Sequence, residues 1–167
     1  MSAIRLATVL TVCGLSAAFA QSGSPFGGFK HDSRAPIEIT ADSLEVRQSE
    51  QLAIFSGNVV AGQGTLRLTA NEVKVFYVQE SSDADTGAIS KLDATGNVFL
   101  SNGAETAKGA RATYDVKRGM VEMSGNVILT QGDNAASGET LEIDLNTGVG
   151  RITSGVQVIF KPATQDN

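Results

Sequence analysis

The stretch SGNVV at residues 56–60 recurs along this chain and decides its fold. Related copies read TGNVF at 95–99 and SGNVI at 124–128, and a weaker copy reads SGVQV at 154–158. The glycines of these copies are 39, 29 and 30 residues apart. Regular spacing in this range is typical of proteins built from repeated structural units.

A second phrase alternates with the first. It reads ADSLEV at 41–46, ANEVKV at 70–75, GARATY at 109–114 and GETLEI at 138–143, and its starts are 29, 39 and 29 residues apart. Because both phrases share one period and one insertion, they indicate a strand-pair unit repeated about four times. Such a fold forms long surfaces and grooves more readily than compact catalytic pockets.

Apolar residues alternate with polar ones at period two along most of the body, which predicts half-buried β-strands and an all-β fold. Turn residues separate the alternating segments. We therefore expect eight long antiparallel strands, at residues 36–46, 51–61, 65–78, 88–101, 105–116, 119–131, 136–145 and 149–160.

A small, turn-like triplet lies near the middle of each expected strand, and glycine inside a strand usually marks a bulge or a sharp bend. Eight strands bent at one level give about sixteen short strands in two facing sheets, joined at a crease, with apolar inner faces. The pattern alone favours a dry core between these sheets. The alternative is a groove that opens along one side and holds an apolar ligand.

The first and last strands, near Ile37 and Val158, have no evident partner beyond their single neighbour. Exposed strand edges favour aggregation unless they are protected, and in a repeat protein they can serve as docking sites for another chain.

The N-terminus has the features of an export signal. Arg5 precedes a short apolar run at 6–17, and AFA at 18–20 matches a cleavage site. We expect residues 1–20 to be a cleaved signal peptide; the alternative is a retained anchor, for which the run is short. Cys13, the one cysteine, lies inside it, so the mature chain would carry no disulfide.

Beyond the signal peptide we expect a flexible Gly- and Ser-rich leader at 21–35, one domain at 36–161 and a short tail at 162–167. Phe26 and Phe29 could dock onto the body, but a mobile leader is the preferred interpretation. From Gln21 onward the chain has 12 Lys and Arg against 18 Asp and Glu, a formal charge of −6, which argues against nucleic-acid binding.

No residues form a recognisable catalytic or metal-binding set. His31, the one histidine, falls in the leader, where it is poorly placed to act as a general base. The acidic run at 83–87 lacks the later ligands of a calcium loop. We therefore expect no enzyme activity, no metal and no cofactor.

Four segments carry a resemblance to a known family: APIEI at 35–39, FSGNVV at 55–60, QGTL at 63–66 and ANEV at 70–73. They resemble the LptA (OstA-like) family of periplasmic lipopolysaccharide-transport proteins, including the OstA-like domains of LptC and LptD, over residues 35–160. The resemblance implies a β-jelly-roll or "β-taco" of about sixteen antiparallel strands, periplasmic location, and a lipid groove in place of a dry core.

In function, the resemblance implies a carrier that shields the acyl chains of lipid A and passes lipopolysaccharide from the inner to the outer membrane. An LptC-like partner would dock at the N-terminal edge and an LptD-like partner at the C-terminal edge, and copies could join head to tail. The alternatives are a membrane-anchored, LptC-like protein and a dry-core structural or adhesive module.

Strand alternation and the family pattern together predict which side chains line the groove. The family would also allow a basic residue near Phe76 and Tyr77, at the groove mouth, and this chain has none at those two positions. The expected lining residues are Ile37, Ile39, Leu44, Val46, Phe55, Val59, Leu66, Leu68, Val73, Val75, Val98, Leu100, Tyr114, Met123, Val127 and Leu129.

Overall fold

A computed structural model describes residues 28–29, 32, 34–79 and 86–161, and within them the chain forms ten β-strands and one short 3₁₀ turn. The elements are β1 (Ile37–Thr40), β2 (Ser43–Arg47), η1 (Gln48–Glu50), β3 (Leu52–Gln63), β4 (Leu66–Gln79), β5 (Thr86–Ser101), β6 (Glu105–Asp115), β7 (Met120–Gln131), β8 (Asn134–Asp144), β9 (Val149–Thr153) and β10 (Gln157–Ile159). The predicted signal peptide, tail and acidic run at 83–85 lie outside the described residues.

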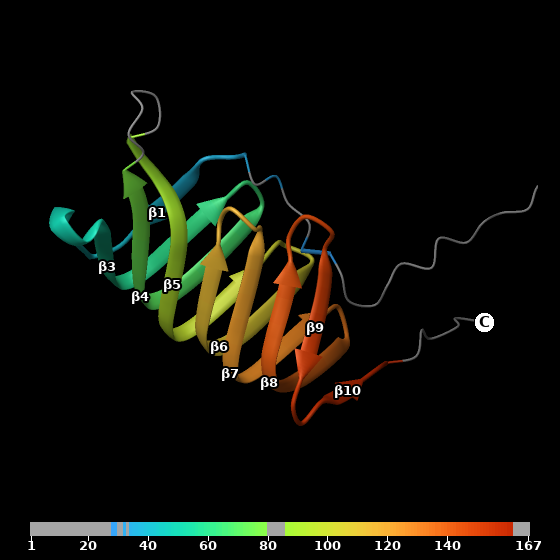
Figure 1. The fold of residues 1–167 in the computed structure, drawn as a ribbon. Coiled ribbons are helices and arrows are strands. Elements are labelled where there is room, and N and C mark those ends of the chain that lie inside the picture. The colour runs from blue at the N-terminus through green and yellow to red at the C-terminus, as the bar shows by residue number, and fades with distance from the viewer. Residues whose placement is uncertain (1–27, 30–31, 33, 80–85, 162–167) are drawn as a thin grey trace, which may run out of the picture.

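All ten strands belong to one antiparallel sheet. Its order is β1-β3-β4-β5-β6-β7-β8-β10, with β2 also paired to β3 and β9 also paired to β8. Figure 1 shows this sheet folded over on itself along a line that crosses the middle of the long strands. Counting the six long bent strands twice and the four short strands once gives the sixteen segments that were predicted.

The repeated SGN triplets form the crease. Gly57 and Asn58, Gly96 and Asn97, and Gly125 and Asn126 all have positive φ, and so do Ser154 and Gly155 in the weaker copy. Glycine and asparagine adopt this left-handed conformation at the lowest cost. At Ser56/Val59 and Ser124/Val127 the register shifts by one residue against the neighbouring strand. Each triplet therefore inserts a bulge that turns its strand through the fold line.

The second repeated phrase supplies small or hydrogen-bonding residues opposite each bulge. A Cβ on Gly125 would lie 2.6 Å from the Cβ of Ala110, and Asn58 Nδ2 donates to Asp42 Oδ2 at 2.8 Å. The Asp42 amide also donates to the Gly57 carbonyl at 2.9 Å. The two phrases interleave in sequence because each bulge packs against the adjacent strand at the same level.

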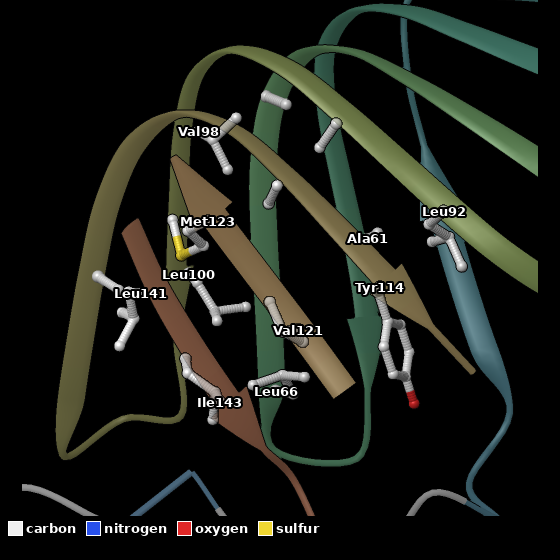
Figure 2. Packing of buried hydrophobic residues seen from close by; sticks show 14 of the residues in the cluster. Ala61, Leu66, Leu92, Val98, Leu100, Tyr114, Val121, Met123, Leu141 and Ile143 are labelled. Atoms are coloured by element: carbon white, nitrogen blue, oxygen red, sulfur yellow. The ribbon is translucent and has the colours of Figure 1, made fainter. Parts of the chain in front are cut away.

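Between the two halves of the folded sheet, which we call the arms, lies the apolar core. One arm contains β2, β9 and the half of each long strand that lies on their side of the crease, such as the last residues of β6 and the first of β7. The other arm contains β1, β10 and the remaining halves, such as the last residues of β5 and the first of β6. Registered neighbours form rows across the inner face, and one such row consists of Phe55, Val73, Ala94, Ala112, Met123 and Leu141. Figure 2 shows Val98, Leu100, Met123 and Ile143 pointing into this interior.

Within the described residues, no helix is long and apolar enough to cross a membrane.

Candidate functional site

The structure places the predicted lining residues on the inner faces of the two arms. Ten of the sixteen are buried: Val59, Leu66, Val73, Val75, Val98, Leu100, Tyr114, Met123, Val127 and Leu129. Four more are partly buried and pack against this core: Ile37, Ile39, Phe55 and Leu68. Residues 98–100 are apolar on both faces of their strand, so the sequence left their facing open; in the structure Val98 and Leu100 are each 1% exposed, whereas Phe99 faces outward, beside Lys108.

The remaining two predicted residues, Leu44 and Val46, are 56% and 59% exposed. They pair in register with Phe55 and Ala53, so they belong to the inner face. They are exposed because β2 is the edge strand of its arm and pairs only with β3 among the described strands. The apolar inner face therefore continues beyond the covered interior at this end.

The opposite end of the sheet shows the same feature. Val158 on β10 pairs with the buried Ala136 and is 44% exposed. Both edges of the sheet thus present inner-face apolar side chains to solvent, whereas the strands between them bury theirs. This gradient of burial follows from the open sheet order, in which β1 and β2 at one end and β9 and β10 at the other each have one neighbour.

Several inner residues were missing from the predicted set. Leu92, Val121, Leu141 and Ile143 are 0–5% exposed and complete the rows between the predicted residues. Their alternation with polar neighbours could have identified them. Gln63 and Glu105 are also buried, at 5% and 0% exposed, but their polar side chains gave no signal of an inward position.

The middle of the interior is closely packed. A small apolar cleft with a volume of about 30 Å³ remains between the arms, bordered by Ile37, Ala61, Leu66, Leu92, Leu100 and Tyr114 among others. This volume would hold a water molecule or two. A long alkyl chain can enter the middle of the interior only if the arms separate or if side chains are displaced.

A buried hydrogen bond joins the arms at their free ends. Tyr114 Oη, on the arm that contains β2, donates to Gln63 Oε1 at 2.9 Å on the other arm. Gln63 Nε2 in turn donates to the carbonyl of Ala35 at 2.9 Å. Burial and the nearby Asp115 carboxylate raise the pKa of the Tyr114 phenol above 10.0, so the hydroxyl stays protonated at neutral pH. Figure 2 shows this hydroxyl directed away from the bends of the strands.

Basic side chains lie on the outer surface. Arg67 is exposed, and Lys74 lies near Glu72. Lys91 Nζ lies 4.3 Å from the centre of the Phe76 ring and 2.8 Å from Asp93 Oδ2. Lys91, on the neighbouring strand β5, therefore places a positive charge beside Phe76. In the part of the chain that the structure describes, no three His, Cys, Asp or Glu side chains are grouped to hold a metal ion.

Two known proteins are similar in sequence to parts of this chain. An uncharacterized protein of Rhizobium meliloti (strain 1021) is 38% identical over 114 residues, which cover 63% of this chain and 61% of that protein. The LPS-assembly protein LptD of Sodalis glossinidius is 38% identical over 77 residues, which cover 46% of this chain and 9% of LptD. The chain therefore spans less than two thirds of each of these relatives.

Among solved structures, LptH, the LptA homologous periplasmic component of the lipopolysaccharide transport device from Pseudomonas aeruginosa, aligns with a TM-score of 0.67. The alignment covers 78% of this chain and 99% of LptH at 20% identity, and it confirms the predicted fold. A family model described as LptA/(LptD N-terminal domain) LPS transport protein matches residues 38–149. This chain therefore belongs to the LptA/LptD N-terminal family of lipopolysaccharide-transport proteins.

Proposed function

We propose that the protein is a periplasmic carrier that covers the acyl chains of lipopolysaccharide between its two arms and forms part of a bridge from the inner to the outer membrane. The observation that carries this proposal is the continuous apolar inner face, which is covered in the middle and exposed at both edges through Leu44, Val46 and Val158. A second domain of the same kind placed against either edge would extend the face without interruption.

The energetics favour such a path. Each CH₂ of an acyl chain gains about 0.8 kcal/mol when it is removed from water. A row of similar apolar surfaces lets the lipid move between neighbouring domains with a small change in free energy. The protein then needs only to bind the lipid, and membership of this transport family confirms the prediction that it is not an enzyme.

The two edges of the sheet also support the proposal that partner domains dock there. β1 and β2 would pair with an LptC-like domain, and β9 and β10 would pair with an LptD-like domain or with a further copy of this chain. Among the described strands, each edge strand pairs with one neighbour only, and addition of a strand to such an edge is a common mode of docking between sheets.

The experiment that tests the carrier function compares two substitutions of the same kind on opposite faces. Leu44→Glu introduces a carboxylate on the exposed inner face, and Ile128→Glu does the same on the outer face, where Ile128 is 46% exposed. Both positions are solvent-accessible, so both variants should remain folded. Binding of purified rough-type lipopolysaccharide should weaken at least about tenfold for Leu44→Glu, because a charge opposes burial against acyl chains.

The control variant Ile128→Glu should bind like the wild type. If both variants lose affinity equally, binding does not depend on the inner face. If the folded wild type does not bind lipopolysaccharide at all, the filled interior favours the second candidate function, a dry-core module that acts through its strand edges.

A further inference from the structure

The N-terminal leader enters the interior of the folded sheet. Phe29 is 2% exposed and belongs to the buried apolar core, so the expectation of an undocked leader is wrong at this residue. Phe29 lies outside every strand of the sheet. It is therefore a core residue that the sheet itself does not supply.

Polar contacts fix the leader beside Phe29. The amide of Gly28 donates to Glu105 Oε2 at 2.7 Å, and Asn102 Nδ2 donates to the Gly28 carbonyl at 2.6 Å. Glu105 is 0% exposed, and a Cβ on Gly28 would lie 3.1 Å from its carboxylate. A buried carboxylate is costly unless it accepts hydrogen bonds, so Glu105 favours a docked leader and the close approach favours glycine at position 28.

A second attachment lies seven residues further along. The carbonyl of Ala35 accepts a hydrogen bond from Gln63, and Gln63 also accepts the hydrogen bond from Tyr114 of the other arm. Gln63 ends β3 and Glu105 begins β6, so both attachments lie on turns at the free ends of one arm. The described part of the leader is thus attached at Gly28 and at Ala35 to the free ends of one arm, opposite the crease.

We propose that Phe29 acts as an internal plug, which occupies apolar space between the arms when lipid is absent and is displaced by an acyl chain when lipid binds. This inference rests on the proposed carrier function. The cleft of about 30 Å³ in the middle of the interior is too small for a long alkyl chain. Among the described residues, Phe29 is the buried aromatic side chain that can leave without breaking a strand pairing. Its departure would also free the segment that is bonded to Gln63, at the contact between the arms.

Competition of this kind lowers the apparent affinity for lipid. When only a fraction of the molecules have an undocked leader, the apparent dissociation constant rises by the inverse of that fraction. The apolar surface of one buried phenylalanine corresponds to roughly ten- to a hundredfold in an equilibrium constant. Removing the plug should therefore tighten lipid binding by about tenfold or more.

Tryptophan fluorescence can follow the plug directly, because the chain contains no tryptophan. In a Phe29→Trp variant of the full protein, the emission should be blue-shifted without lipid and should move to the red when purified rough-type lipopolysaccharide is added. Lipopolysaccharide binding with an unchanged, blue-shifted emission would overturn the plug and leave the carrier function intact.

Affinity provides the second measurement. Phe29→Ala should bind rough-type lipopolysaccharide about tenfold more tightly than the wild type, and Glu105→Gln, which weakens the bond to Gly28, should shift affinity in the same direction by less. Phe99→Ala, on the outer face, is the matched control and should leave affinity unchanged. Circular dichroism checks that each variant is folded.

The outcomes separate the two proposals. Equal or weaker binding by folded Phe29→Ala and Glu105→Gln would overturn the plug alone. Failure of the wild type and of both variants to bind would overturn the carrier function, and the plug with it.

Discussion

The crease can be tested at Gly125, where the repeated SGN phrase meets the neighbouring strand most closely. Gly125 has φ +84°, and an added Cβ would lie 2.6 Å from the Cβ of Ala110, well inside the 3.5–4.0 Å at which carbon atoms attract most strongly. Ala110 Cβ is bonded to the backbone and cannot rotate away. In Gly125→Ala, the left-handed conformation should cost about 1–2 kcal/mol, and the forced contact about 1–3 kcal/mol more.

The matched control is Gly132→Ala. Gly132 also has positive φ, at +55°, but nothing lies within 4 Å of the position that an added Cβ would occupy, so it should show the conformational cost alone. Both substitutions also reduce the conformational entropy of the unfolded chain, which offsets about 0.4–1 kcal/mol of the destabilisation. We therefore expect destabilisation of about 1 kcal/mol for Gly132→Ala and about 2–4 kcal/mol for Gly125→Ala.

The assay is thermal and urea unfolding followed by circular dichroism. At about 4 °C per kcal/mol for a domain of this size, Gly125→Ala should lower Tm by roughly 8–16 °C. The double variant Gly125→Ala/Ala110→Gly moves the methyl group across the contact, and should recover most of the cost of the clash in a double-mutant cycle. If Gly125→Ala costs no more than Gly132→Ala, or if the double variant recovers nothing, close packing does not explain why the phrase requires glycine.

Burial, ionisation and the sheet edges each give a further prediction. Leu141→Ala, at a fully buried position, should lower the free energy of unfolding by about 2–5 kcal/mol, whereas Ile128→Ala on the outer face should change it by about 0.5 kcal/mol; similar losses in urea titrations would contradict the inward assignment of Leu141. Because the folded pKa of Tyr114 lies above its ordinary 10.0, the contribution of this group to stability should be constant well below that pH and should be lost as pH rises through the folded pKa; Tyr114→Phe should lose this alkaline slope in unfolding measured across pH, and a retained slope would assign it to another group. Ile159→Lys on β10, where Ile159 is 69% exposed, should weaken concentration-dependent self-association in sedimentation velocity, since charge protects a strand edge from pairing; an unchanged distribution would remove β10 from the docking surface.

Local pattern was sufficient to predict most of the sheet. The predicted strand at 51–61 is β3 at 52–63, and the predicted strand at 119–131 is β7 at 120–131. The prediction succeeded because alternation at period two depends only on which side chains face the core. The outer strands were less accurate, since the expected strand at 36–46 divides into β1 and β2, and the one at 149–160 divides into β9 and β10. Edge strands have one neighbour, so the bend interrupts their pairing altogether.

The inward-facing side chains of the candidate site could be predicted from the sequence, but the extent to which each one is covered could not. Val98 and Leu100 lie inside, although the apolar residue between them left their facing open in the sequence. Leu44 and Val46 also face inward but remain exposed, because exposure depends on what covers a side chain. Gln63 was missed because a polar side chain at an inward position has no signature until its partner is known. Its bond to Tyr114 links residues 51 positions apart.

The repeat, the strand periods and the crease can all be read from the amino-acid order, because each follows from short-range rules: alternation of burial along a strand, and the tolerance of glycine and asparagine for a left-handed backbone. Three features emerge only when the chain is folded: the middle of the interior is closely packed, the arms are joined through Tyr114 and Gln63, and Phe29 is held in the core by the contact between Gly28 and Glu105. That last contact joins residues 77 positions apart. It is a hydrogen bond to a carboxylate that would be costly to bury unpaired, and its two groups meet only after the sheet has folded, so no local pattern encodes it.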